Sequence, residues 1–192
     1  MIRTARVWTA LLVLAALMAL LPVEAAAGAA SRGATVSQPA TTERTYNDSV
    51  LGLELPPSQA SGADCSAPQY APFFGGASGD LPGPWYAFVP HTQLSPSARI
   101  CPGGQFGLST LVNGKPTTVT GSFVSGSVVR TSSVCPGTQT YQVSAKLAIT
   151  ATVAGRARPG TASFQNVTLI HFVDGACNAF FAIVVGPVTL RF

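Results

Sequence analysis

Apolar and polar residues alternate almost without a break over residues 139–153. The apolar positions are Tyr141, Val143, Ala145, Leu147, Ile149, Ala151 and Val153. The residues between them are polar except for Ala148. A period of two residues is typical of a strand with one buried face, so we predict a long β-strand here.

Shorter apolar runs predict further strands on both sides of this one. They cover residues 46–55, 85–89, 105–112, 117–124, 127–130, 162–173 and 176–185. Asn113-Gly114 and Asp174-Gly175 suit two-residue hairpin turns, in which both central residues take positive φ. The run 176–185 is apolar on both faces, which predicts a strand that is covered on both sides. Gly186-Pro187 then predicts a bulge or a bend.

The remaining segments set the fold class. Residues 58–84 are rich in Gly, Pro, Ser and Ala, and predict a long loop. No segment of the mature chain has the period of a helix. Short strands separated by Gly, Pro, Asn and Asp turns are the pattern of an all-β protein. We predict an antiparallel β-sandwich or a small β-barrel built from hairpins.

The N-terminal region has the features of a secretory signal peptide. Arg3 and Arg6 precede an apolar stretch, and Ala25-Ala26-Ala27 supplies a cleavage pattern of small residues. We predict a signal peptide at 1–27, a flexible linker at 28–45 and one β-rich, disulfide-stabilised domain at 46–192. The protein is then secreted or held in the cell envelope after cleavage near Ala27, without a stable membrane span. An uncleaved N-terminal anchor is the alternative.

Charge excludes some classes of partner. Only 9% of the residues are charged, and the formal net charge of the whole chain is +4. No cluster of Lys and Arg forms a basic stripe, so we expect no nucleic-acid partner. Arg outnumbers Lys by nine to two, which favours a bacterial source.

Four cysteines follow the predicted signal peptide: Cys65, Cys101, Cys135 and Cys177. An even number of cysteines in an exported protein indicates two disulfides, with three possible connectivities. We favour Cys65–Cys101 and Cys135–Cys177. No pair of cysteines has C-x-x-C spacing, and neither histidine stands at ligand spacing from one, so we predict no metal site and no cofactor.

Few residues are candidates for catalysis. No nucleophile elbow, phosphate-binding loop or H-E-x-x-H motif is present. His171 is the most suggestive polar residue: a two-residue turn at Asp174-Gly175 would place it opposite Asn178, within hydrogen-bonding reach. A structural histidine is the simpler interpretation, and a solvated loop histidine is the simpler one for His91. We therefore assign no catalytic residue.

Aromatic residues supply the better candidates for binding. They are Tyr70, Phe73, Phe74, Trp85, Tyr86 and Phe88. Exposed rings of this kind stack on sugars and other flat ligands, whereas buried rings would only fill the core. We predict that Tyr70, Trp85, Tyr86 and His91 contact a ligand, which is a glycan, a small apolar molecule or an envelope protein. The leading hypothesis is a non-catalytic binding or scaffold module of unknown oligomeric state. The alternative is a secreted enzyme that uses His171 or His91 as acid or base.

Overall fold

The structure is a computed structural model that describes residues 43–55 and 62–192 of the chain. The predicted signal peptide and most of the predicted linker lie outside these residues. The strands are β1 Thr45–Glu54, β2 Gln69–Gly79, β3 Gly83–His91, β4 Ser97–Ile100, β5 Gly103–Val112, β6 Lys115–Ser133, β7 Gly137–Val153, β8 Arg156–Val173 and β9 Ala179–Arg191. All of them belong to one antiparallel sheet, and the described residues include no helix. The all-β, antiparallel prediction is therefore confirmed.

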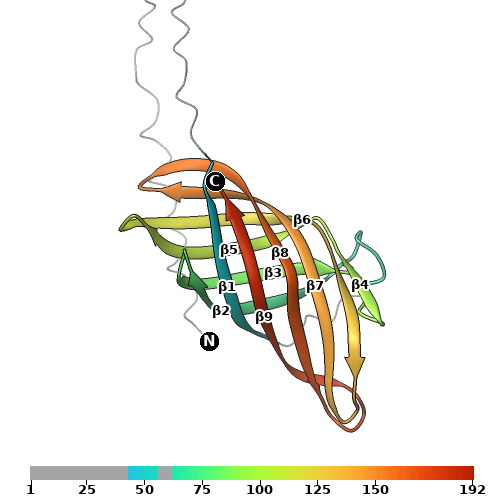
Figure 1. The fold of residues 1–192 in the computed structure, drawn as a ribbon. Coiled ribbons are helices and arrows are strands. Elements are labelled where there is room, and N and C mark those ends of the chain that lie inside the picture. Colours follow the sequence, from blue (N-terminus) through green and yellow to red (C-terminus); the bar gives the residue numbers. More distant parts are fainter. Residues whose placement is uncertain (1–42, 56–61) are drawn as a thin grey trace, which may run out of the picture. The chain divides into compact units, whose positions relative to one another are not determined.

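The strand pairings form a closed circuit. The sheet order is β2-β1-β9-β8-β7-β6-β4-β3-β5, and two further pairings join β2 to β3 and β6 to β5. Eight strands therefore follow one another in chain order, each paired with the next, and β1 pairs with β9. Short β4 bridges β3 and β6 beyond the end of β5. In Figure 1, β1, β9, β8 and β7 lie across β2, β3 and β5, which run behind them.

The core occupies the inside of this circuit. It is one cluster of buried side chains drawn from all nine strands. On β7 the buried face follows the predicted alternation: Tyr141, Ala145, Leu147, Ile149 and Ala151 are buried, and Val143 and Val153 are half-buried. In a single closed sheet only one face is enclosed, which is why the alternation is so regular.

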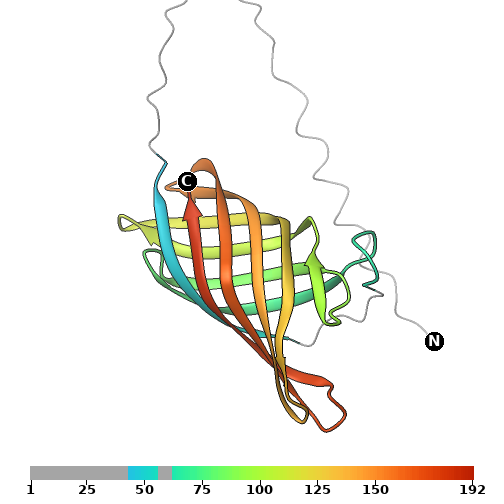
Figure 2. The ribbon, with the colours of Figure 1, turned by 45° about the vertical axis from the view of Figure 1, so that its right-hand side comes forward.

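The two ends of the circuit differ. At one end the residue before β1 meets the residue after β9, because Arg44 and Phe192 exchange two backbone hydrogen bonds. The other end contains the tips of β7, β8 and β9, which project at the bottom of Figure 2. Both disulfides, Cys65–Cys101 and Cys135–Cys177, lie in segments at this second end, which we call the disulfide end. Their pairing is the predicted one.

In the part of the chain that the structure describes, no helix has the length and hydropathy needed to cross a membrane.

Several boundaries differ from the predictions. The predicted loop 58–84 contains β2, whose run of Gly, Pro and Ala hides the strand. The two short strands predicted over 117–130 are one long strand, β6, because a bulge between Phe123 and Ser125 lets it continue past Gly126. Strand β4 was not predicted. The Asn113-Gly114 turn has φ of 50° and 72°, as a two-residue hairpin requires, and this prediction is confirmed.

The hairpin between β8 and β9 is wider than predicted. Its loop covers residues 174–178, because the Asp174 carboxylate accepts hydrogen bonds from the backbone N–H groups of Ala176 and Asn178. As a result His171 lies opposite Ala182, and the predicted pairing with Asn178 is wrong. The prediction that this region is covered on both sides is also wrong: 67% of the Phe180 surface is exposed. A register shift between β8 and β9 does occur opposite Gly186-Pro187, but its extra residue lies on β8, where residues 165–167 face residues 186–187, and the pairing of Gly186-Pro187 with β1 is regular.

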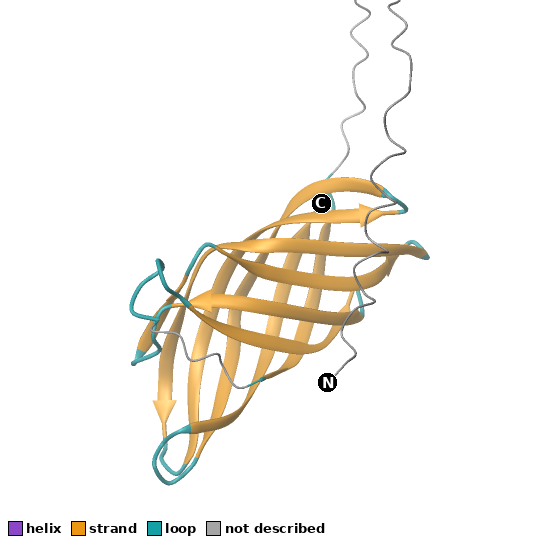
Figure 3. Cartoon of the chain, turned by 180° about the vertical axis from the view of Figure 1, so that it is seen from behind, coloured by secondary structure: helices purple, strands orange, loops and turns teal. Residues whose placement is uncertain are grey.

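The buried face of strand β1 is not the face that carries its leucines. Leu51, Leu53 and Leu55 are exposed, and the inward positions are Asp48, Val50, Gly52 and Glu54. Gly52 is needed at its position because a Cβ there would lie 2.6 Å from Cζ2 of Trp85. The neighbouring pairings fix this phase, since β1 is bonded to β2 on one side and to β9 on the other. Figure 3 shows the molecule from behind, with strands enclosing the interior on this side too.

Candidate ligand-binding site

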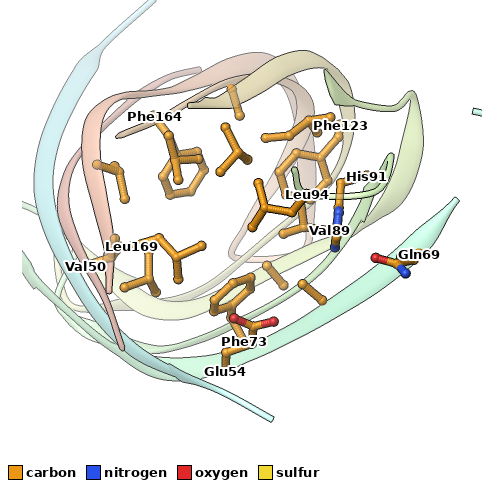
Figure 4. A pocket seen from close by; sticks show the side chains of 18 of the residues that line it. Val50, Glu54, Gln69, Phe73, Val89, His91, Leu94, Phe123, Phe164 and Leu169 are labelled. Atoms are coloured by element: carbon orange, nitrogen blue, oxygen red, sulfur yellow. The ribbon is translucent and has the colours of Figure 1, made fainter. Parts of the chain in front are cut away.

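An apolar cavity of about 160 Å³ lies inside the circuit of strands. Every strand except β5 contributes to its lining. The lining residues are Val50, Glu54, Gln69, Ala71, Phe73, Trp85, Ala87, Val89, His91, Leu94, Ile100, Phe123, Val128, Val143, Ala145, Phe164, Val167, Leu169, His171 and Val184. Figure 4 shows these side chains converging on a common space from opposite sides. Sixteen of the twenty are apolar, so the cavity suits a hydrophobic occupant.

The polar lining residues gather towards the disulfide end. Glu54 is the last residue of β1, Gln69 is the first of β2 and His91 is the last of β3. His171 is two residues before the end of β8. In Figure 4, Glu54, Gln69 and His91 lie on one side of the pocket. An apolar chamber with polar groups at one end can accommodate an amphipathic small molecule in a single orientation.

Glu54 and His171 form a pair at this polar end. Nε2 of His171 lies 3.2 Å from Oε2 of Glu54, although the two residues are 117 positions apart in the chain. Both side chains are largely buried, with exposed fractions of 13% for His171 and 8% for Glu54. An imidazole N–H that donates to a buried carboxylate satisfies both groups where water has little access.

The Tyr141 ring packs against the imidazole of His171. Its ring centroid lies 5.0 Å from that of His171, and its hydroxyl donates a hydrogen bond of 2.7 Å to Oε1 of Gln139. Burial raises the pKa of the Tyr141 phenol above its ordinary value, and nearby Arg130 opposes that rise. The phenol therefore stays neutral at physiological pH and keeps its donor proton. The result is a fixed position for His171 between a ring and a carboxylate.

The turn between β2 and β3 lies at the opposite end of the circuit of strands. Leu81 in this turn is folded into the core and is 1% exposed. Its backbone N–H donates to Oδ1 of Asp48, and the Thr110 hydroxyl donates to the Pro82 carbonyl. Asp48 is buried, and its second oxygen, Oδ2, has no hydrogen-bond partner. Burial raises the pKa of the Asp48 carboxyl; the Leu81 N–H lowers it, and the nearby Asp80 raises it further.

The predicted ligand contacts divide between two faces. Trp85 and His91 line the cavity, whereas Tyr70 and Tyr86 lie on the outer face and are exposed. The predicted loop position of Tyr70, Phe73 and Phe74 is wrong, because they belong to β2, where alternate side chains point in opposite directions. Trp85 is fixed in the wall, since its indole N–H lies within hydrogen-bonding distance of the Leu51 and Gly76 carbonyls. His91 also ends a strand, and its Nδ1 lies 2.7 Å from the Thr92 carbonyl.

The exposed aromatic residues are part of an apolar row on the outside of the sheet. Cross-strand pairing aligns Ile183, Leu53, Phe74 and Tyr86 from β9 to β3. The Phe88 ring packs edge-on against both Phe74 and Tyr86. A role for Tyr70 and Tyr86 in binding remains a prediction, and of the two only Tyr86 belongs to this row.

Glu54 was missed by the sequence reasoning. The signal was present: it shares the inward phase of Val50, but the leucines beside it suggested the opposite face. Among the described residues, no group of three or more His, Cys, Asp and Glu side chains is placed to hold a metal ion. Comparison of the chain with protein-family models, with curated proteins and with solved structures finds no match.

Proposed function

We propose that this protein is an exported binding module in which the closed circuit of strands forms a small β-barrel around one small apolar ligand. The observation that carries the proposal is the cavity of about 160 Å³ with its apolar lining. Closed barrels of eight strands have interiors just wide enough to be filled by side chains or to hold one small ligand. An apolar cavity of about 150 Å³ stays dry and takes up benzene, so a ligand of about one six-membered ring is expected here.

Export is the second part of the proposal. The signal-peptide pattern at 1–27 and the two disulfides both favour an oxidising compartment outside the cytoplasm. Both disulfides join segments at the end of the cavity that carries the polar residues. They restrain the loops around the route by which a ligand would enter, and a preformed entrance lowers the ordering cost of binding.

Thermal unfolding in the presence of toluene tests the proposal. A ligand at ten times its Kd stabilises the native state by about 1.4 kcal/mol, which raises Tm by about 3–6 °C in a domain of about 150 residues. Ala87→Leu fills the cavity, because Ala87 is buried in its wall, and should abolish the shift. Val143→Ile is a milder filling variant, and Ala148→Leu on the exposed face of β7 is the matched control.

Wild type and Ala148→Leu should show the same rise in Tm, and the filling variants should show a smaller rise or none. Equal shifts in all four proteins would place toluene outside the cavity and contradict the proposal. No shift in the wild type up to the solubility limit of toluene would contradict it as well.

A second candidate function is proton transfer on a small apolar substrate. The observation that favours it is the Glu54–His171 pair beside the cavity, since a carboxylate that orients an imidazole is a recurrent arrangement in acid–base catalysis. The test is recovery of the ligand that co-purifies with wild type and with a His91→Gln/His171→Gln variant, followed by mass spectrometry. The binding function predicts the same molecule in both proteins. An enzyme would yield substrate from the variant and product from the wild type.

A further inference from the structure

We propose that Glu54 makes the cavity selective for ligands that carry a hydroxyl group, such as a phenol or a small cyclic alcohol. This inference rests on the proposed function and concerns the head group of the ligand. The relevant part of the structure is the polar end of the cavity, where a carboxylate stands in an otherwise apolar wall.

Glu54 has acceptor capacity beyond its pairing with His171. A carboxylate offers about four lone-pair positions, and in the part of the chain that the structure describes only the His171 N–H donates to it, at Oε2. His171 itself is held in place by Glu54 and by the Tyr141 ring. Its role is to position the carboxylate at the cavity. A ligand hydroxyl that donates a hydrogen bond to Glu54 would therefore complete the hydrogen bonding of a side chain that is only 8% exposed.

The chemistry of Glu54 excludes other head groups. A ligand carboxylate would place a second negative charge beside it in a medium of low polarity. An ammonium group would lose its hydration in a wall of aliphatic and aromatic side chains, which costs far more for an ion than for a neutral group. A purely hydrocarbon ligand fits the cavity but offers no hydrogen-bond donor to the Glu54 carboxylate. A neutral hydroxyl group supplies that donor at a smaller desolvation cost.

The size of the cavity limits the rest of the ligand. A volume of about 160 Å³ accommodates one six-membered ring with a small substituent, and excludes long-chain fatty acids or sterols. Phe73 and Trp85 in the wall offer flat partners for such a ring. The proposed ligand is therefore a single ring with one hydroxyl group directed towards Glu54.

Calorimetric titration with phenol, toluene and benzoate tests this inference, because phenol and toluene have nearly the same shape. The wild type should bind phenol about tenfold more tightly than toluene, the factor expected from one hydrogen bond to a charged acceptor, and should bind benzoate least. Glu54→Leu should remove the preference for phenol while retaining toluene. Glu54→Gln, which keeps the side-chain shape and one acceptor oxygen, should give an intermediate ratio and serves if the Leu variant does not fold.

The outcomes separate the two proposals. If the wild type binds toluene as tightly as phenol, the cavity takes ligands but the inference about Glu54 is wrong. A preference for phenol that persists unchanged in Glu54→Leu and Glu54→Gln would assign the selection to another group and also overturn it. If neither phenol nor toluene binds to the wild type, the proposed function itself fails, and the inference fails with it.

Discussion

The buried carboxylate of Asp48 makes the stability of the protein depend on pH in an unusual direction. Most paired carboxylates have a lowered pKa and stabilise the folded state at neutral pH. Asp48 has a raised pKa, because burial disfavours its charged form more than the Leu81 N–H favours it. Its Oδ2 is buried without a partner. Asp48→Asn removes the charge and keeps an acceptor oxygen for the Leu81 N–H.

The sign of the effect follows from linkage. With the folded pKa above the unfolded value of 3.8, the folded state binds more protons between the two values. The contribution of Asp48 to stability is therefore fully present below pH 3.8 and is lost as pH rises through the folded pKa. Asp48→Asn lacks this loss. It should match the wild type at about pH 3 and exceed it at pH 7 by about 1 kcal/mol, because the neutral amide has no charge to hold in a buried position.

Urea unfolding followed by circular dichroism between pH 3 and pH 8 measures this difference. A gain of about 1 kcal/mol corresponds to a rise in Tm of about 2–4 °C for a domain of this size. Asp48→Ala is the contrasting variant: it leaves the Leu81 N–H buried without an acceptor and should lose about 1–3 kcal/mol at pH 3, and less at pH 7, where the wild type has lost the contribution of Asp48. The reasoning is refuted if Asp48→Asn and wild type keep a constant difference from pH 3 to pH 8, or if Asp48→Asn is the less stable protein at pH 7.

Three other predictions test the surrounding structure. Val50→Ala should lower the free energy of unfolding by about 2 kcal/mol, whereas Leu53→Ala should lower it by about 0.5 kcal/mol or less. Urea unfolding measures both, and the reverse order would show that the face of β1 that carries Val50 is not the buried one. Gly52→Ala should displace the Trp85 indole, lower stability by about 1–3 kcal/mol and shift the Trp85 fluorescence; unchanged emission would argue against this contact. The hydroxyl and the backbone N–H of Ser66 donate hydrogen bonds to the Asp64 carboxylate and lower its pKa. The contribution of Asp64 to stability is therefore present above pH 3.8 and is lost as the pH falls. Asp64→Asn should therefore be less stable than wild type at pH 7, with a difference that shrinks in acid, and a difference that grows in acid would contradict it.

The sequence was most informative where one face of a strand is continuously buried. The alternation on β7 predicted its buried face because the strand has the enclosed core on one side and solvent on the other. Both disulfides join the cysteines that were predicted to pair. In β2 the same reasoning failed, because its Gly and Pro residues are turn formers by composition and only the pairing with β1 and β3 makes them a strand.

The site was less predictable than the fold. The sequence predicted a strand at β1 but not which of its faces is buried: Leu51, Leu53 and Leu55 are exposed, whereas Gly52 packs against Trp85 and Glu54 lines the cavity. The pairing of Glu54 with His171 depends on the contact between the strands at the two termini, β1 and β9, and on β8 lying next to β9. A contact between residues that lie 117 positions apart leaves no pattern in the local spacing of the sequence. His91 was predicted on its own and only the fold places it at the same end.

The asymmetry of the cavity argues for one direction of entry. At the end where Arg44 meets Phe192, Leu81 is folded into the core and its backbone is tied to Asp48 on β1, so opening that end would expose a buried leucine and break a buried hydrogen bond. At the disulfide end, half-buried Gln69, His91 and Leu94 border the cavity. A ring that entered there with its hydroxyl group trailing would bury its apolar body first and bring the hydroxyl group to Glu54 last. The position of Glu54 at the polar end is therefore the one at which it can select a head group without obstructing the passage of the ring.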